Sequence, residues 1–193
     1  MTKIKEKEVE KLKYRLNLIL IALLCSTTLA PCVMFYFRGP GEFRWLIIFI
    51  GISYLISRLP KSFYDRFQIS TDLKLYKKLK VDLFKRFSTD GDLINMRIRR
   101  KYPTHRNITN FESIRQKLSE TYSIEKSHTV LFMFCLLTNI YAFWTNSIGT
   151  AIILFIGNIL FNYYPNLLQQ YNRIRYSRIV NSYSPQTNTN DKA

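Results

Sequence analysis

The stretch IGTAIILFIGNILFNYYPNLLQQYNRIR (148–175) begins as an apolar run and ends in polar and basic residues. Its first 17 residues, Ile148 to Tyr164, carry no charge, and this is about the shortest run that can cross a bilayer as a helix. Amides, a proline and two arginines follow, although a simple membrane anchor would need none of them. The stretch therefore predicts a transmembrane helix with a polar face that serves a further purpose.

Three more apolar blocks with almost no charges precede this stretch, at residues 16–37, 43–57 and 129–145. Apolar residues collected into such blocks are typical of multi-span membrane proteins and not of soluble cores. We therefore predict an all-α integral membrane protein, a single membrane-embedded domain over residues 1–180, with about four transmembrane helices (16–37, 43–57, 129–145 and 148–165). Whether the second one crosses fully is open, because its apolar run has only 14 residues.

The net charge of +16 is high enough to raise nucleic-acid binding as a function. The Lys and Arg residues, however, gather in residues 1–15, in residues 57–129 and after the last span, while the Asn146-Ser147 connection has none. This distribution predicts a multi-pass protein of the cell membrane with both termini and the segment 58–128 in the cytoplasm. We expect anionic lipid headgroups, and no nucleic acid, as partners of the basic segment. No His or Cys spacing predicts a metal site.

The 58–128 segment is too long for a simple connection and should contain helices. Ser70-Thr71-Asp72 predicts an N-cap for a helix over residues 72–87. One face of this helix would carry the apolar residues Tyr76, Leu79, Leu83 and Phe87. We expect the helix either to lie on the membrane surface or to pack on the rest of the segment, with equal weight.

Three shorter stretches complete the expected organisation. RIRRKYPTHR (97–106) should be extended around Pro103, with His105 at the surface. A second helix should begin near Asn110 and continue without a break into the span at 129–145. Residues 181–193 are polar and lack apolar periodicity, so a disordered tail is predicted there.

Glu125 and His128 are the first candidate site residues, because they lie three positions apart where this second helix enters the membrane. A carboxylate beside an imidazole can fix its tautomer and raise its basicity, which suits a general base. The alternative is an ion pair at the membrane interface without a catalytic role.

A polar stripe follows the last span if its helix continues past Pro165. Pro165 cannot donate a hydrogen bond to the carbonyl of Phe161, which predicts a kink and a spare acceptor within the membrane. The stripe should face the interior of the helix bundle near Glu125 and His128, either as a functional face or as a polar seam between helices. Its members occur at steps of 4, 3, 4 and 3 residues: Asn162, Asn166, Gln169, Arg173 and Tyr176.

These features together resemble the glycosyl-4,4'-diaponeurosporenoate acyltransferase family of the staphyloxanthin pathway and its uncharacterised relatives. The resemblance covers about residues 55 to 178. It includes the R-x-P element at Arg58-Leu59-Pro60, the E-x-x-H motif at Glu125 and His128, and the N-x-P-x-x-x-Q-R-Y-N-R-P-R motif that Asn162 begins. The chain departs from this last motif at three points: an extra residue before Pro165, Gln170 in place of arginine, and Ile174 in place of proline.

The resemblance implies transfer of a fatty acyl group to a sugar hydroxyl of a glycolipid or of a glycosylated carotenoid-like lipid. His128, oriented by Glu125, would accept the hydroxyl proton, and Asn162, Gln169 or Asn172 would stabilise the oxyanion. Arg173 and Arg175 would hold the phosphates of the co-substrate, an acyl-CoA or acyl-carrier protein, with no bound cofactor. Tyr171 belongs to the same substrate-binding motif.

Two alternatives remain open at this stage. The chain could be a small non-enzymatic membrane subunit that stabilises or recruits a partner protein through its polar stripe and basic segment. A membrane transferase of another kind, such as a methyltransferase, is the weaker alternative.

Overall fold

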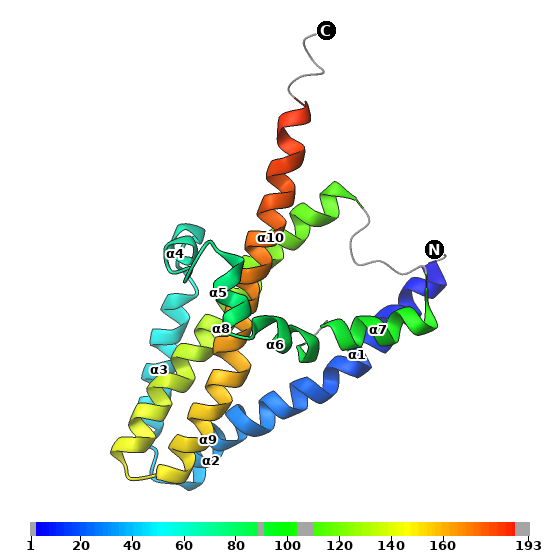
Figure 1. Cartoon of the computed structure of the whole chain (residues 1–193). Helices are drawn as coiled ribbons and strands as arrows, with labels where there is room; N and C mark the ends of the chain where they lie inside the picture. The colour runs from blue at the N-terminus through cyan, green and yellow to red at the C-terminus, as the bar shows by residue number, and fades with distance from the viewer. Residues whose placement is uncertain (1–2, 89–90, 104–109, 188–193) are drawn as a thin grey trace.

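The computed structural model describes residues 3–88, 91–103 and 110–187, and within these ranges every regular element is helical (Figure 1). Three helices there are long and apolar enough to cross a membrane. The first joins α1 (Lys3–Leu24), η1 (Cys25–Leu29) and α2 (Ala30–Arg38). The second is α8 (Phe111–Trp144), and the third joins α9 (Ile148–Asn158), η2 (Ile159–Tyr163) and α10 (Tyr164–Thr187). Three of the four predicted spans therefore lie in helices of sufficient length.

The remaining predicted span is the shorter helix α3 (Phe43–Ile56). Its 14 residues extend for about 21 Å, which is less than the roughly 30 Å of a hydrocarbon core. α3 packs along α8, and Phe49 is buried in a cluster with Phe35, Tyr36, Ala142 and Ala151. The helix is therefore part of the bundle, although its length does not qualify it as a full span.

The bundle is closed at one end by its two short connections, residues 39–42 and 145–147, which lie together at the lower end of Figure 1. The backbone N–H of Glu42 donates to the Tyr141 hydroxyl, and this bond ties the first connection to α8. We call residues 58–128 the central segment. Its short helices and the C-terminal part of α10 lie toward the opposite end of the bundle.

A π-helical turn precedes a proline by two residues in each of the two interrupted spans: η1 ends before Pro31 and η2 ends before Pro165. A proline has no N–H for the carbonyl four residues earlier, so the carbonyls of Thr27 and Phe161 each lose a helical donor. The Thr27 carbonyl lies against Gly157, where an added Cβ would come within 2.8 Å of its oxygen. The predicted irregularity at Pro165 is thus present as a widened turn.

The central segment differs from its prediction around residue 80. The expected 72–87 helix is two helices, α5 (Leu73–Lys78) and α6 (Val81–Phe87), because Lys80 adopts a left-handed conformation with φ 60°. This break allows both Tyr76 and Val81 to pack on α10. The remaining members of the predicted apolar face are exposed: Leu79, Leu83 and Phe87. The cap was predicted correctly, since Asp72 accepts a hydrogen bond from the Lys74 amide.

The stretch from residue 97 was expected to be extended but is helical as far as Lys101, in α7 (Asp92–Lys101). α7 pairs with the first half of α1, where Val9, Ile94 and Ile98 form a small buried cluster. The Tyr102 hydroxyl donates to Glu8 of α1 at 2.9 Å. This contact between residues distant in sequence explains the helix, while His105 lies outside the described residues. The short helix α4 (Lys61–Arg66) precedes α5.

The two longest helices follow their predicted starts closely. Asn110 caps α8 through a capping box with Ser113, and the helix continues unbroken to Trp144, as predicted. α10 extends further than expected, because residues 181–187 of the predicted disordered tail are helical.

Candidate functional site

The predicted site residues from the E-x-x-H motif and the C-terminal motif meet where α8 and α10 pack together. Glu125 and Arg173 form an ion pair, and both side chains are only 3–4% exposed. Gln170 donates from its amide to the other carboxylate oxygen of Glu125 at 2.8 Å. Both oxygens of Glu125 are therefore occupied by groups of α10.

Arg173 also ties α10 to α4 and to the residues that follow it. Its Nε donates to Gln68 Oε1 at 3.1 Å, and its Nη2 donates to the Tyr64 carbonyl at 3.3 Å. The guanidinium lies 4.5 Å from the centre of the Tyr122 ring, in a cation–π contact. The hydrogen bonds of this buried arginine are thus made to groups of the protein itself, as a buried charge requires.

The polar contact between α8 and α10 continues toward the centre of the bundle. Asn166 donates to the Thr129 hydroxyl at 3.2 Å, Asn162 donates to Asn158 at 2.9 Å, and Asn158 donates to the Phe132 carbonyl at 3.1 Å. We call this row of residues the polar seam: Asn158, Asn162, Asn166, Gln170 and Arg173. This row matches the interpretation of the polar stripe as a seam between helices, with Gln170 in the place expected for Gln169.

Gln170 links the seam to the central segment. Its Oε1 accepts hydrogen bonds from the Tyr76 hydroxyl at 3.1 Å and from the Ile69 amide at 3.2 Å. Burial raises the pKa of Tyr76, so its hydroxyl remains protonated and able to donate. The polar seam thus holds α8, α10 and α5 in one arrangement.

A cavity of about 1050 Å³ lies on the other side of α8 and α10, and His128 is in its wall. The remaining walls come from η2, from α6, which packs on α10, and from α1 and α7, which diverge from α10 in Figure 1. We call this the His128 cavity. Three other predicted site residues also line it: Gln169, Asn172 and Arg175.

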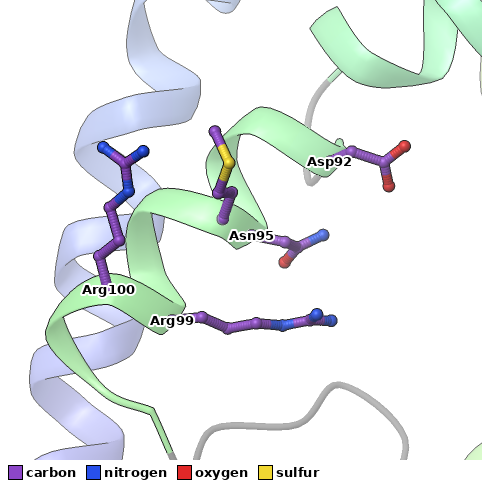
Figure 2. A pocket seen from close by; sticks show the side chains of 5 residues that line it. Asp92, Asn95, Arg99 and Arg100 are labelled. Carbon is purple, nitrogen blue, oxygen red and sulfur yellow. The ribbon is translucent and has the colours of Figure 1, made fainter.

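The His128 cavity changes from apolar to charged along its length. Residues of the later part of α1 and of η2 make its apolar end, among them Leu20, Leu23, Leu24 and Leu160. Five basic residues also line the cavity: Lys13, Lys85, Arg99, Lys117 and Arg175. Lys117 and Arg175 mark its cationic end, because Lys117 lies about three helical turns from His128 and Arg175 lies about three turns beyond η2. Figure 2 shows a smaller, neighbouring pocket on α7 that shares Asp92, Asn95 and Arg99 with the His128 cavity. Arg99 leaves α7 on the same side as Asp92 and Asn95, while Arg100, which lines only the smaller pocket, points to another side.

The imidazole of His128 lies beside the widened turn of η2. The Asn162 side chain and the Phe161 backbone are its polar neighbours. Its Nδ1 is buried and has no hydrogen-bond partner in the part of the chain that the structure describes. The spare carbonyl predicted at Phe161 therefore lies next to the histidine, although the predicted contact between Glu125 and His128 is replaced by the pairing of Glu125 with α10.

The structure divides the predicted site residues into two groups. The cavity brings together His128, Gln169, Asn172 and Arg175. The other four lie outside the cavity wall, since Glu125, Asn162 and Arg173 belong to or contact the seam and Tyr171 packs in the buried cluster around Tyr76. Arg58 of the R-x-P element is exposed and contacts Tyr54.

Sequence reasoning missed Gln170, Gln68 and Tyr76 as partners in the seam. Steps from Asn166 to Gln169 or to Gln170 fit helical spacing equally well, so adjacent glutamines could not be distinguished. The one signal was that Gln170 occupies a position where the family motif has an arginine, which indicates a polar environment.

The fold and the cavity define a helical membrane protein with a site suited to an amphiphilic ligand that carries negative charge. The family model described as glycosyl-4,4'-diaponeurosporenoate acyltransferase matches residues 60–182, so the chain belongs to this acyltransferase family. The matched region begins just before α4 and ends within α10, and it contains the whole polar seam. Comparisons with curated proteins and with solved structures each gave no match.

Proposed function

We propose that the protein transfers a fatty acyl group to a sugar hydroxyl of a glycolipid or of a glycosylated carotenoid-like lipid in the membrane. One observation carries this proposal: His128, with a buried and unpartnered Nδ1, lines a cavity that is apolar at one end and cationic at the other. The membership of an acyltransferase family supports the reaction class.

His128 is the proposed general base. Its neutral imidazole accepts the proton of the acceptor hydroxyl as that oxygen attacks the thioester carbonyl of the donor. The new C–O bond forms an ester, the C–S bond breaks, and the imidazolium returns the proton to the leaving thiolate. The reaction therefore converts an alcohol and a thioester into an ester and a thiol, with the histidine restored.

Gln169 and Asn172 are the proposed donors to the oxyanion of the tetrahedral intermediate. Both line the cavity with His128, and each carries an amide N–H that can stabilise developing negative charge. Asn162 is less suited to this role, because it is buried and donates to Asn158.

Glu125 is proposed to act as a positioning residue, through Arg173 and Gln170. Their contacts fix α8 against α10, and His128 is one helical turn from Glu125. The ion pair thereby sets where the imidazole lies relative to Phe161 and to the cavity wall. This role replaces direct orientation of His128 by the carboxylate.

The cell membrane is the proposed location of the site. Both termini and the central segment would lie at the cytoplasmic face of the cell membrane, where Lys and Arg residues of α5 to α7 would contact anionic lipid headgroups. The donor would then enter from the cytoplasm, and the acceptor from the membrane.

Comparative lipid mass spectrometry tests this function. Cells that produce the wild-type chain would be compared with cells that produce His128→Ala at matched membrane abundance. We expect a glycosylated lipid that gains one fatty-acyl mass only with the wild-type chain. Identical lipid profiles from two stably inserted proteins would contradict the proposal and favour a non-enzymatic membrane subunit.

A further inference from the structure

The distance between His128 and the basic residues restricts the donor that the cavity can accept. Lys117 precedes His128 by eleven residues on α8, which places the two about 16 Å apart along the helix axis. Arg175 follows Phe161, the neighbour of His128, by 14 residues and thus by about 21 Å. Lys117 and Arg175 therefore lie far from the proposed reacting centre.

The lining of the cavity carries a net positive charge, and its cations come from five helices. Three carboxylates, Glu10, Asp92 and Glu120, line the cavity together with the five basic residues. Lys85 pairs with Asp92 at 3.0 Å and Lys117 pairs with Glu120 at 2.6 Å. The lining thus holds more cations than carboxylates, contributed by separate helices, and such an excess suits a phosphate group.

The apolar residues lie around and beyond His128, toward the centre of the membrane. Leu20, Leu23 and Leu24 of α1 face Leu160 of η2 across this part of the cavity. An acyl chain placed here would be shielded from water, and its carbonyl end would lie close to His128.

We propose that the His128 cavity binds the acyl donor as a phosphopantetheine thioester, with its phosphate at the cationic end and its thioester at His128. The inference rests on the proposed function and names its donor class. The long pantetheine arm separates a thioester from its phosphate by a distance of the order found between His128 and Lys117. A phospholipid does not fit this geometry, because its ester carbonyls lie only a few bonds from its phosphate.

Binding to the full chain in nanodiscs of neutral lipid tests this assignment. The probes are palmitoyl-CoA and palmitoyl-pantetheine, which share the acyl chain, the thioester and the pantetheine arm, whereas only palmitoyl-CoA carries the phosphates and the adenosine attached to them. We expect palmitoyl-CoA to bind at least about tenfold more tightly, the value of one charge-assisted hydrogen bond. Arg99→Ala should remove most of this preference.

Arg100→Ala is the matched control. It removes the same charge from the adjacent residue of α7, and both arginines are exposed, but Arg100 is not part of the cavity wall. The preference for palmitoyl-CoA should survive in this variant. Equal binding of the two probes, or equal effects of the two substitutions, would overturn the assignment.

Transfer assays separate this inference from the proposed function. Acyl transfer that proceeds with a phospholipid donor, and not with palmitoyl-CoA or palmitoyl-carrier protein, would refute the donor class while leaving the reaction intact. Arg99-dependent binding of palmitoyl-CoA without transfer from any donor would support the binding site and contradict the proposed function. The relative kcat/KM of the CoA and carrier-protein thioesters would identify the natural source.

Discussion

The polar seam and the His128 cavity occupy two faces of the same pair of helices, and they use the same kinds of residue differently. On the seam face, Glu125, Gln170 and Arg173 bind one another and are buried. On the cavity face, His128 keeps an unpartnered nitrogen, and Arg175 is exposed. Polar residues in a membrane helix are therefore not equivalent evidence of function, since the face on which they lie decides their role.

The two faces differ because burying a charged group costs free energy. A buried carboxylate or guanidinium is tolerated only when its partners replace its hydration, as the α8–α10 contacts do. A group that lines a cavity can keep spare hydrogen-bonding capacity for a ligand. The comparison leads to opposite expectations for substitutions on the two faces.

Arg173→Ala should have the largest effect on stability. It would leave the Glu125 carboxylate buried without its charge partner and would remove the contacts to Gln68 and Tyr64. We expect a loss of about 3–5 kcal/mol in the free energy of unfolding. Thermal unfolding in detergent measures this loss, with Arg175→Ala as the control on the cavity face. Equal unfolding temperatures for the two variants would contradict the division between the faces.

The adjacent glutamines give the sharpest comparison. Gln170→Ala removes the bonds to Glu125, Tyr76 and Ile69 and should cost about 1–3 kcal/mol of stability. Gln169→Ala should leave stability nearly unchanged and lower kcat for acyl transfer, because this side chain lines the cavity. A reversed pattern would show that α10 presents its other side to α8.

Tyr76→Phe should have the smallest effect. The phenylalanine keeps the buried ring and loses only the hydroxyl that bonds Gln170 and the Ser70 carbonyl. We expect a loss of about 1 kcal/mol in stability and no change in the turnover of the folded protein. Thermal unfolding of both proteins in the same detergent, without chemical denaturant, would measure the loss of stability. A loss of turnover at full stability would place Tyr76 in the site.

Features governed by local sequence were predicted best. The apolar blocks indicated the membrane helices, Asp72 and Asn110 indicated two N-caps, and Pro165 indicated the spare carbonyl of Phe161. Each depends on residues within a few positions of one another. The family was also recognisable from its C-terminal motif.

Features governed by distant contacts could not be predicted in the same way. The break at Lys80 follows from the packing of Tyr76 and Val81 on α10, and helical α7 follows from its pairing with α1. The cavity also depends on this pairing, because α1 and α7 form one of its walls. Glu125 and His128 lie close in sequence, but only the position of α10 shows that Glu125 binds Arg173.

The most direct test is to measure unfolding temperature and acyl transfer per folded molecule for purified His128→Ala. Because His128 belongs to the cavity and makes no hydrogen bond through Nδ1, we predict an unfolding temperature near that of the wild type. Turnover should fall by about 10²- to 10⁴-fold, the usual contribution of a general base. A variant that unfolds as readily as Arg173→Ala, and that retains wild-type turnover when folded, would contradict the assignment of chemistry to the cavity face.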